Sequence, residues 1–243
     1  MGYVDLHCHW VPAIDDGART PEQSVDMLRR LQKAGFSTVV ATPHMRPGMF
    51  DNDRPALERA YAGIVSALPA GLPEVHLASE HWFDDVVFRR LMGGHGLPYP
   101  HPEAGSPHRA VLIELSPAQF PIALPARLGD LRRHGLRPVI AHPERYQPAW
   151  KDTEALQPLL DAGACLLLDV CSLTGKYGSQ PQRTAEKLLD EDAYEAACSD
   201  AHRPDDADEA GRAITRLGKL VGRDETERLL SDGPKGILRG EWS

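Results

Sequence analysis

The stretch that decides the fold is Tyr3-Val4-Asp5-Leu6-His7-Cys8-His9, near the start of a 243-residue chain. Its apolar run predicts a short β-strand that ends in His-x-His. Because alternate residues of a strand share a face, the imidazoles of His7 and His9 point the same way. Two such nitrogens suit a divalent metal ion, and Asp15 and Asp16 could add carboxylate oxygens. Alone, the motif is equally compatible with two surface histidines.

Other apolar runs also end at residues that can ligate a metal. They stop at His44, Glu80, Glu114, His142 and the sequence Asp200-Ala201-His202. If these runs are parallel strands of one barrel, their carboxyl ends lie on one face, where such barrels place their chemistry. Donors from both ends of the sequence favour a closed ring over an open doubly wound sheet, which collects ligands near one switch point.

Helical segments alternate with these strand-like runs. We expect helices over residues 24–33, 55–68, 84–92, 123–134, 153–162, 182–189 and 205–221, the first preceded by the N-cap Thr20. About seven β/α units fit this pattern, which predicts an α/β fold: a distorted seven-stranded (β/α) barrel related to the TIM barrel. The length suits one domain over residues 1–243.

Two stretches are expected to lack regular structure. Residues 93–109 are crowded with Gly, Pro and His and show no apolar period, so we expect a long surface loop with solvated histidines; a substrate lid is the alternative. Near the end of the chain, residues 224–230 predict a short last helix, followed by a frayed tail to Ser243.

Charge and composition exclude several classes of protein. A formal net charge of −8 argues against a general nucleic-acid binder, which needs a basic surface. The sequence has no signal segment and no stretch of membrane-spanning length. We therefore expect a cytoplasmic protein without direct membrane insertion, although its partner could be membrane-bound.

The cysteines address one enzyme mechanism. Cys8, Cys165, Cys171 and Cys198 all lie in or beside apolar runs, which favours buried thiols over disulfides in the cytosol. A thiolate tyrosine phosphatase needs Cys-x5-Arg, but none of the four has an arginine six residues later. A phosphocysteine mechanism is therefore disfavoured.

The order of the motifs resembles the polymerase-and-histidinol-phosphatase (PHP) superfamily. Within it, the chain resembles the bacterial manganese-dependent protein-tyrosine phosphatases that accompany capsule and exopolysaccharide tyrosine kinases. The resemblance spans nearly the whole chain. Three phrases are more specific than the metal pattern: His44-Met45-Arg46-Pro47-Gly48-Met49-Phe50, His142-Pro143-Glu144-Arg145-Tyr146 and Leu173-Thr174-Gly175-Lys176-Tyr177-Gly178.

The candidate metal ligands are too many for one tetrahedral ion and enough for two or three ions that share carboxylates. They are His7, His9, Asp16, His44, Glu80, Glu114, His142, Asp200 and His202. The resemblance implies three Mn²⁺ ions with Glu80 as a bridge, whereas the donors alone also suit Fe, Zn or Mg. It also selects Asp16 over Asp15, for which we expect a turn-capping role. His81 should point to the opposite face of its strand.

Clustered metals would suit hydrolysis of a phosphate monoester. They lower the pKa of a bridging water, so that hydroxide exists near neutral pH, and they neutralise phosphate oxygens. Arg145 is the first candidate cation for the phosphate, with a surface ion pair to Glu144 as the alternative. Arg46 is the second. Arg203 is the third, but relatives carry this arginine a few residues later, which weakens the match.

Two further residues have no assigned role. Asp169 stands near the position where relatives carry a polar amide, and it could compensate for that change or simply be buried beside a cation. Lys176 could touch an acidic substrate, although solvent is its default partner.

The resemblance implies that the enzyme removes phosphate from the phosphotyrosine tail of a bacterial tyrosine kinase in polysaccharide biosynthesis. It also allows a homo-oligomer, since ring-like assemblies occur among relatives. The alternatives are a small-molecule phosphatase of the histidinol-phosphate type and a noncatalytic metal-binding scaffold. Exonuclease activity, known elsewhere in the superfamily, fits the acidic charge poorly.

Overall fold

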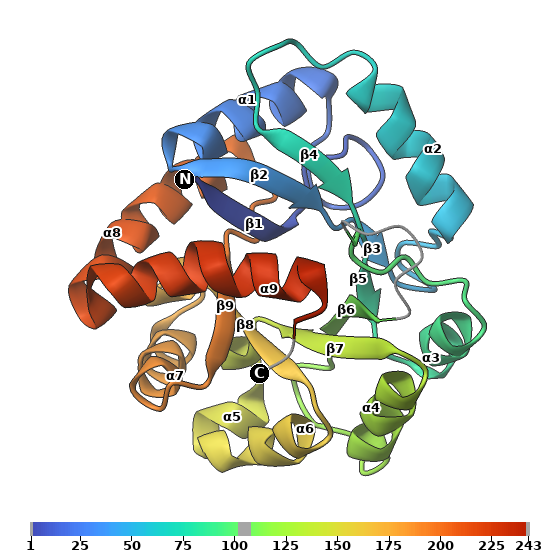
Figure 1. Cartoon of the computed structure of the whole chain (residues 1–243), viewed down its shortest axis with the longest axis vertical. Coiled ribbons are helices and arrows are strands. Elements are labelled where there is room, and N and C mark those ends of the chain that lie inside the picture. The colour runs from blue at the N-terminus through green and yellow to red at the C-terminus, as the bar shows by residue number, and fades with distance from the viewer. Residues whose placement is uncertain (1, 102–107, 242–243) are drawn as a thin grey trace.

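The strands form a ring of parallel runs in the computed structural model, which describes residues 2–101 and 108–241 (Figure 1). Two of the runs are interrupted: β2 (Phe36–Ala41) leads into β3 (His44–Met45), and β4 (Glu74–Leu77) leads into β5 (Glu80–Trp82). The others are β1 (Tyr3–Cys8), β6 (Arg109–Glu114), β7 (Leu136–Ala141), β8 (Cys165–Asp169) and β9 (Tyr194–Cys198). Within the described residues this makes seven runs, as expected from the sequence.

The strands pair in nearly sequential order around the ring, from β1 to β9. The orders are β1-β2-β4 and β3-β5-β6-β7-β8-β9, with every pairing parallel. The ring closes where the end of β1 meets the chain after β9, through a parallel bridge between Cys8 and Ala201. There the amide of Asp200 donates to the carbonyl of His7 at 2.9 Å.

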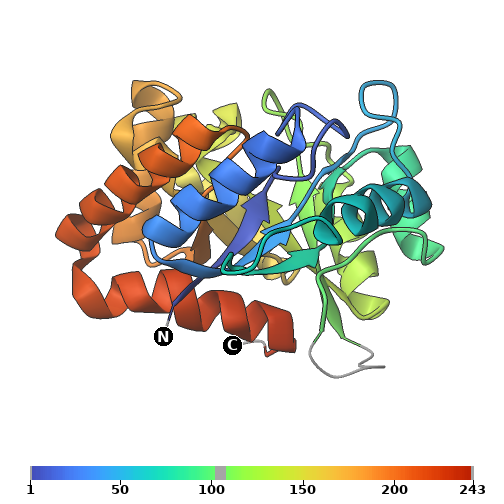
Figure 2. The same cartoon turned by 90° about the horizontal axis from the view of Figure 1, so that it is seen from above.

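Helices cover the outside of the ring (Figures 1 and 2). The first begins as expected, because the Thr20 hydroxyl accepts a hydrogen bond from the amide of Gln23 at 3.3 Å. The helices that follow the strands are α1 (Pro21–Lys33), α2 (Arg54–Val65), α3 (Asp85–Met92), α4 (Leu124–Arg133), α5 (Gln147–Lys151), α6 (Gln157–Asp161), α7 (Ser179–Asp190) and α8 (Pro204–Glu227). No helix within the described residues is both long and apolar enough to cross a membrane.

The apolar core has two layers, set by alternation along the strands. The inner layer takes side chains from every strand run and so fills the ring; Leu6, Leu112 and Leu167 are members. The outer layer packs the opposite strand faces against the helices, as Ile113 and Leu128 do. Beyond the inner layer, at the carboxyl ends of the strands, the side chains become polar.

The end of the chain is helical rather than frayed. Helix α8 kinks at Gly222, whose φ is 80°, and a π-helical turn then leads into α9 (Gly233–Arg239). Leu229, Leu230 and Ile237 are buried. As Figure 2 shows, α9 crosses the end of the ring opposite the strand tips. The expected frayed tail is therefore wrong up to Glu241, and residues 242–243 lie outside the described part.

Part of the Gly/Pro/His-rich stretch is also buried, contrary to the expected surface loop. Tyr99 is enclosed, and its hydroxyl donates to the carbonyl of Leu6 at 2.8 Å. Its amide pairs with Ala110 at the start of β6, away from the strand tips. His95 and His108 are exposed, as expected. Residues 102–107 lie outside the described residues, so the lid alternative stays untested there.

Candidate metal centre

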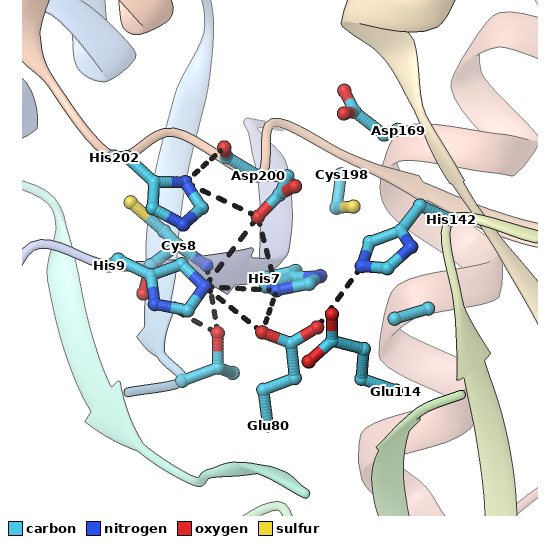
Figure 3. Close-up of polar contacts among 12 residues, drawn as sticks. His7, Cys8, His9, Glu80, Glu114, His142, Asp169, Cys198, Asp200 and His202 are labelled. Atoms are coloured by element: carbon cyan, nitrogen blue, oxygen red, sulfur yellow. Dashed lines mark hydrogen bonds and ion pairs between the residues drawn. The ribbon is translucent and has the colours of Figure 1, made fainter. Parts of the chain in front are cut away.

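Strand β1 delivers its two histidines through an irregularity in its pairing. Asp5 pairs with Val39 and Cys8 with Ala41, so β1 uses one residue more than β2 over this span. Such a bulge re-aims side chains. The Nε2 atoms of His7 and His9 then lie 3.1 Å apart, as the His-x-His spacing predicted (Figure 3).

Strand alternation places the two glutamates. Glu80 shares the inner face with Ala78, and Glu114 follows the inner residue Leu112 by two positions. His81 points away from the centre, as expected: its Nδ1–H donates to the carbonyl of Leu112 at 2.9 Å. Burial lowers the pKa of His81 to about 4, so this histidine is a neutral structural residue.

Glu80 directs its carboxylate into the cluster, toward His7 and His9 (Figure 3). Its Oε2 is 3.2 Å from His7 Nε2, 3.3 Å from His9 Nε2 and 3.0 Å from His44 Nδ1. Its other oxygen, Oε1, is 3.1 Å from His142 Nε2. One carboxylate therefore faces four imidazoles from three strand ends, an arrangement that suits a bridging ligand.

The ligand atoms fall into overlapping groups within the described residues. Each of four groups has all its atoms within 4.8 Å of one another: His9, Asp16, His44 and His202; His7, Glu80 and His142; His7, His9 and Asp200; and His44, Glu80 and Glu114. The structure thus brings together all nine residues that the sequence nominated. Because the groups share members, the cluster has room for more than one ion.

Buried atoms without a well-formed hydrogen bond support metal binding. His44 Nδ1, Glu114 Oε2 and Asp200 Oδ1 are buried and form no hydrogen bond of good geometry, although His44 Nδ1 lies 3.0 Å from Glu80 and Asp200 Oδ1 lies 3.2 Å from His7. Such atoms are costly inside a protein unless something satisfies them. Two of them face each other, since His44 Nδ1 is 3.7 Å from Glu114 Oε2. Divalent cations would satisfy all three, and imidazole with carboxylate suits Mn, Fe and Zn.

Electrostatics distinguish the three innermost carboxylates. Burial alone would raise the pKa of Glu80 and Asp200, but nearby cations reverse the shift. His7 and His44 lower the pKa of Glu80 well below its usual range, and His7 and Arg145 do the same for Asp200. For Glu114, burial and then the charge of Glu80 raise the pKa to about 7. The centre therefore has an excess of buried acid that bound cations would stabilise.

Asp15 has a second role that the sequence did not predict. As expected, it caps a turn, because its Oδ1 accepts from the amide of Gly17 at 2.9 Å. Its Oδ2, however, accepts from His9 Nδ1 at 2.8 Å and from the amide of His44 at 3.0 Å. A carboxylate behind a ligating histidine fixes its tautomer and orientation. The only sequence signal for this role was that Asp15 is a second acid directly before the candidate ligand Asp16.

Arg145 is held beside the centre. One guanidinium nitrogen forms an ion pair with Asp200, and another lies 3.9 Å from the buried carboxylate of Asp169. The guanidinium carbon is 4.4 Å from the centre of the Tyr177 ring. The expected alternative partner, Glu144, instead accepts hydrogen bonds from Ser172 at 2.8 Å and Tyr194 at 3.0 Å. Asp169 is thus buried beside a cation, one of the two alternatives left open from the sequence, whereas Tyr177 had no predicted role here.

Arg46 and Arg145 both line a cavity of about 270 Å³ above the centre. The guanidinium carbon of Arg46 stacks 3.7 Å from the ring centre of Trp82. Arg203 is elsewhere: it lines a separate depression together with Arg19. Lys176, for which solvent was the default partner, pairs with Asp206 at 2.8 Å.

Comparison with known proteins agrees with this geometry. The chain is 28% identical over 249 residues to tyrosine-protein phosphatase YwqE of Bacillus subtilis (strain 168), covering 98% of this chain and 92% of that protein. It is 23% identical over 241 residues to tyrosine-protein phosphatase CpsB of Streptococcus pneumoniae, covering 97% and 98%. The enzyme class expected from the sequence agrees with these names.

Solved structures confirm the expected fold. One of the crystal structures of YwqE and CpsB, described as unique metal-dependent tyrosine phosphatases, matches with a TM-score of 0.83 and 27% identity, covering 98% of this chain and 94% of that one. The Escherichia coli phosphotriesterase homology protein, complexed with phosphate in its active site, has a TM-score of 0.61 at 12% identity, covering 98% of both chains. At 12% identity, the match to the phosphotriesterase homology protein is evidence for the barrel fold alone.

The family model for capsular polysaccharide synthesis, CpsB/CapC, matches residues 3–239. Because that match spans nearly the whole sequence, the chain belongs to the CpsB/CapC family.

Proposed function

We propose that the chain is a metal-dependent protein-tyrosine phosphatase that acts on the tyrosine-rich tail of a bacterial tyrosine kinase in polysaccharide synthesis. The observation that carries the proposal is the convergence of nine donor residues, Glu80 among them, beside a cavity lined by two arginines. Its relatives YwqE and CpsB support the substrate class, since both are named tyrosine-protein phosphatases.

The overlapping donor groups would hold the metal ions, and we propose three Mn²⁺ ions. Bound there, the ions would supply Lewis acidity, which activates water and neutralises phosphate oxygens. Glu80 would bridge, because both of its oxygens face imidazoles. Asp15 would keep the Nδ1–H of His9 in place, so that Nε2 presents its lone pair to the cluster.

We assign the binding of the phosphate to the arginines at the cavity. Asp200 and the Tyr177 ring hold the guanidinium of Arg145, so little side-chain freedom would be lost when a phosphate binds. Because Arg145 lines the cavity, its guanidinium group could donate to an oxygen of the substrate there. Arg46, which also lines the cavity, would contribute a second cation. The position of Arg203 outside this cavity gives its proposed phosphate contact no support.

Apolar atoms in the cavity favour an aryl leaving group. Leu115, Pro117 and Tyr146 line it beside the donors. Phe50 stacks on the imidazole of His44, which lines the cavity, and the two ring centroids are 5.3 Å apart. A phenol also leaves more easily than an alcohol, because its pKa is only about 10.

Comparing two substrates tests the proposal. Protein supplied with Mn²⁺ should release phosphate from a phosphotyrosyl peptide with a higher kcat/KM than from histidinol phosphate. The opposite preference would indicate a small-molecule phosphatase, and inactivity with every divalent metal would contradict an enzymatic role.

A paired histidine variant tests the centre itself. His7→Ala combined with His9→Ala should lower turnover by more than about 100-fold, because even partners behind metal ligands are worth about 10–100-fold. The control is His95→Ala combined with His134→Ala, which removes two exposed histidines. Equal activity in the two double variants would support the noncatalytic alternative.

A further inference from the structure

The two arginines that line the cavity differ in what balances their charge. Arg145 forms an ion pair with Asp200, and the buried carboxylate of Asp169 lies 3.9 Å from it. Arg46 forms no ion pair in the part of the chain that the structure describes. Its guanidinium carbon lies instead 3.7 Å from the ring centre of Trp82. No carboxylate therefore balances the charge of Arg46 by direct contact.

The register of the strands brings Arg46 to Trp82. β3 pairs with β5 in parallel, with His44 opposite Glu80. Two residues further along each chain, Arg46 and Trp82 follow, and Trp82 pairs on its other side with Glu114. Because alternate residues of a strand share a face, Arg46 and Trp82 lie on the same face as the ligand pair, one step nearer the strand tips. The contact thus belongs to the rim of the metal centre.

The backbone that carries Arg46 is fixed by a hairpin. The amide of Arg46 donates to the carbonyl of Phe50 at 3.1 Å, and the amide of Phe50 donates back at 2.8 Å. The side-chain amide of Asn52 donates to the carbonyls of Ile14 at 3.0 Å and His44 at 2.9 Å. An arginine side chain still has several rotatable bonds, and ordering them opposes the binding of a ligand. A ring that already holds the guanidinium group lowers that cost.

Stacking on Trp82 leaves the hydrogen-bond donors of Arg46 available. A separation of 3.7 Å is that of two stacked planar groups, so the ring contacts the flat face of the guanidinium group. The N–H donors lie in the plane of that group, where two of them can bind two phosphate oxygens side by side. Among the described residues that line the cavity, Arg46 is included and Trp82 is not. Any effect of Trp82 on a phosphate would therefore pass through Arg46.

We infer that Trp82 is a positioning residue, which holds the guanidinium group of Arg46 so that it binds the phosphate group of the substrate. This inference rests on the proposed function. A phosphate monoester brings negative charge into the cavity, and an arginine without an acidic partner attracts that charge without opposition from a neighbouring carboxylate. At Arg145, Asp200 provides such opposition. Trp82 thus contributes to the affinity for phosphate and not to the binding of metal.

A double-mutant cycle on the full chain supplied with Mn²⁺ tests whether Trp82 acts through Arg46. Trp82→Leu and Arg46→Ala are made singly and together, and Trp82→Phe keeps an aromatic face. The matched control is Phe88→Leu on α3, because the ring centre of Phe88 also lies near a guanidinium carbon, that of Arg127 at 5.2 Å, away from the cavity. The probes are inorganic phosphate, whose Kd calorimetry measures without turnover, and p-nitrophenyl phosphate.

We expect Trp82→Leu to raise the Kd for phosphate and the KM for p-nitrophenyl phosphate about five- to tenfold, because a half-buried cation–π contact is lost. Trp82→Phe should recover most of the affinity, and Phe88→Leu should stay within about twofold of the starting protein. In the Arg46→Ala background, Trp82→Leu should have no further effect. The Mn²⁺ concentration for half-maximal activity should not change, whereas a merely structural defect beside Glu114 would raise it.

Three results would overturn the inference while leaving the phosphatase proposal intact. They are an unchanged Kd for phosphate in Trp82→Leu, an equal loss with and without Arg46, and a raised requirement for Mn²⁺. Failure of the unmodified protein to hydrolyse any phosphate monoester would instead reject the proposed function. The Kd for phosphate would then still decide the role of Trp82.

Discussion

Two histidines of the centre, His9 and His202, are oriented by what their second nitrogen contacts. His9 donates from Nδ1 to Asp15 at 2.8 Å, and the Nδ1 of His202 lies 3.0 Å from the carbonyl of Asp200. Each contact leaves Nε2 free to face the donor cluster. A neutral imidazole without such a partner populates both tautomers, and only one of them presents a lone pair to a metal. The polar groups behind the ligands should therefore influence metal affinity.

Asp15→Asn tests this influence. The amide retains an oxygen to accept from Gly17 but loses the negative charge behind His9. We expect the Mn²⁺ concentration for half-maximal activity to rise about 10–100-fold, with kcat restored at saturating metal.

The matched control for that substitution is Asp51→Asn. Asp51 also caps a turn, accepting from the amide of Gly48 at 2.6 Å, but it touches no histidine within the described residues. If Asp15→Asn and Asp51→Asn required the same Mn²⁺ concentration for half-maximal activity, Asp15 would not orient His9.

Sequence reasoning located the donors but not the residues that hold them. Eight of the nine candidate ligands stand at or just beyond the end of an apolar run, a position that can be read without coordinates, whereas Asp16 was selected over Asp15 by the family resemblance alone. Asp169 and Tyr177 act on Arg145 only because β8 and the loop after it pass beside the turn that follows β7. Nothing in local spacing encodes that proximity. Contacts between side chains of different loops are a property of the assembled ring.

The elements show where tertiary packing overrides local preference. Helices with strong caps, such as α1 after Thr20, were predictable because their signals are local. The end of the chain carries Gly233, Pro234 and Gly236, which predict disorder by propensity alone. It is helical because Leu230 and Ile237 bury their side chains against the end of the ring. The buried segment around Tyr99 misled sequence reasoning for the same reason, since its composition is that of a loop.

Tyr99 gives the buried segment a testable energetic role. Its hydroxyl satisfies the carbonyl of Leu6 where no water has access. Tyr99→Phe should therefore lower the free energy of unfolding by about 1–3 kcal/mol, the cost of an unsatisfied buried acceptor. Urea unfolding of the metal-loaded protein measures the change.

Tyr61→Phe is the control for that measurement. Tyr61 makes an equivalent bond to the carbonyl of Val75 at 2.8 Å but is only partly buried, so water can replace its hydroxyl. An equal loss in the two variants would show that Tyr99 has no special role in the ring interior.

For the molecule as a whole, the centre joins parts of the chain that are far apart in sequence. Asp5 helps to close the ring by accepting from the amide and hydroxyl of Ser199 at 2.9 and 2.5 Å. Just above that junction, His7 of β1 lies 3.2 Å from Asp200 after β9. Metal ions held there would tie the first strand to the last and to the strands between them. The same cations would stabilise Glu114, whose pKa is raised by burial and by Glu80.

Removal of metal should therefore destabilise the whole barrel. A ligand present at 100 times its Kd stabilises the folded state by about 2.7 kcal/mol, which for a chain of this size corresponds to about 5–10 °C in Tm. We expect a chelator such as EDTA to lower Tm by about that amount and added Mn²⁺ to restore it. In His7→Ala combined with His9→Ala, the shift should nearly vanish, because the two histidines contribute to most of the donor groups. If the chelator left Tm unchanged in the unmodified protein, the donors would be holding the strand tips together without a metal.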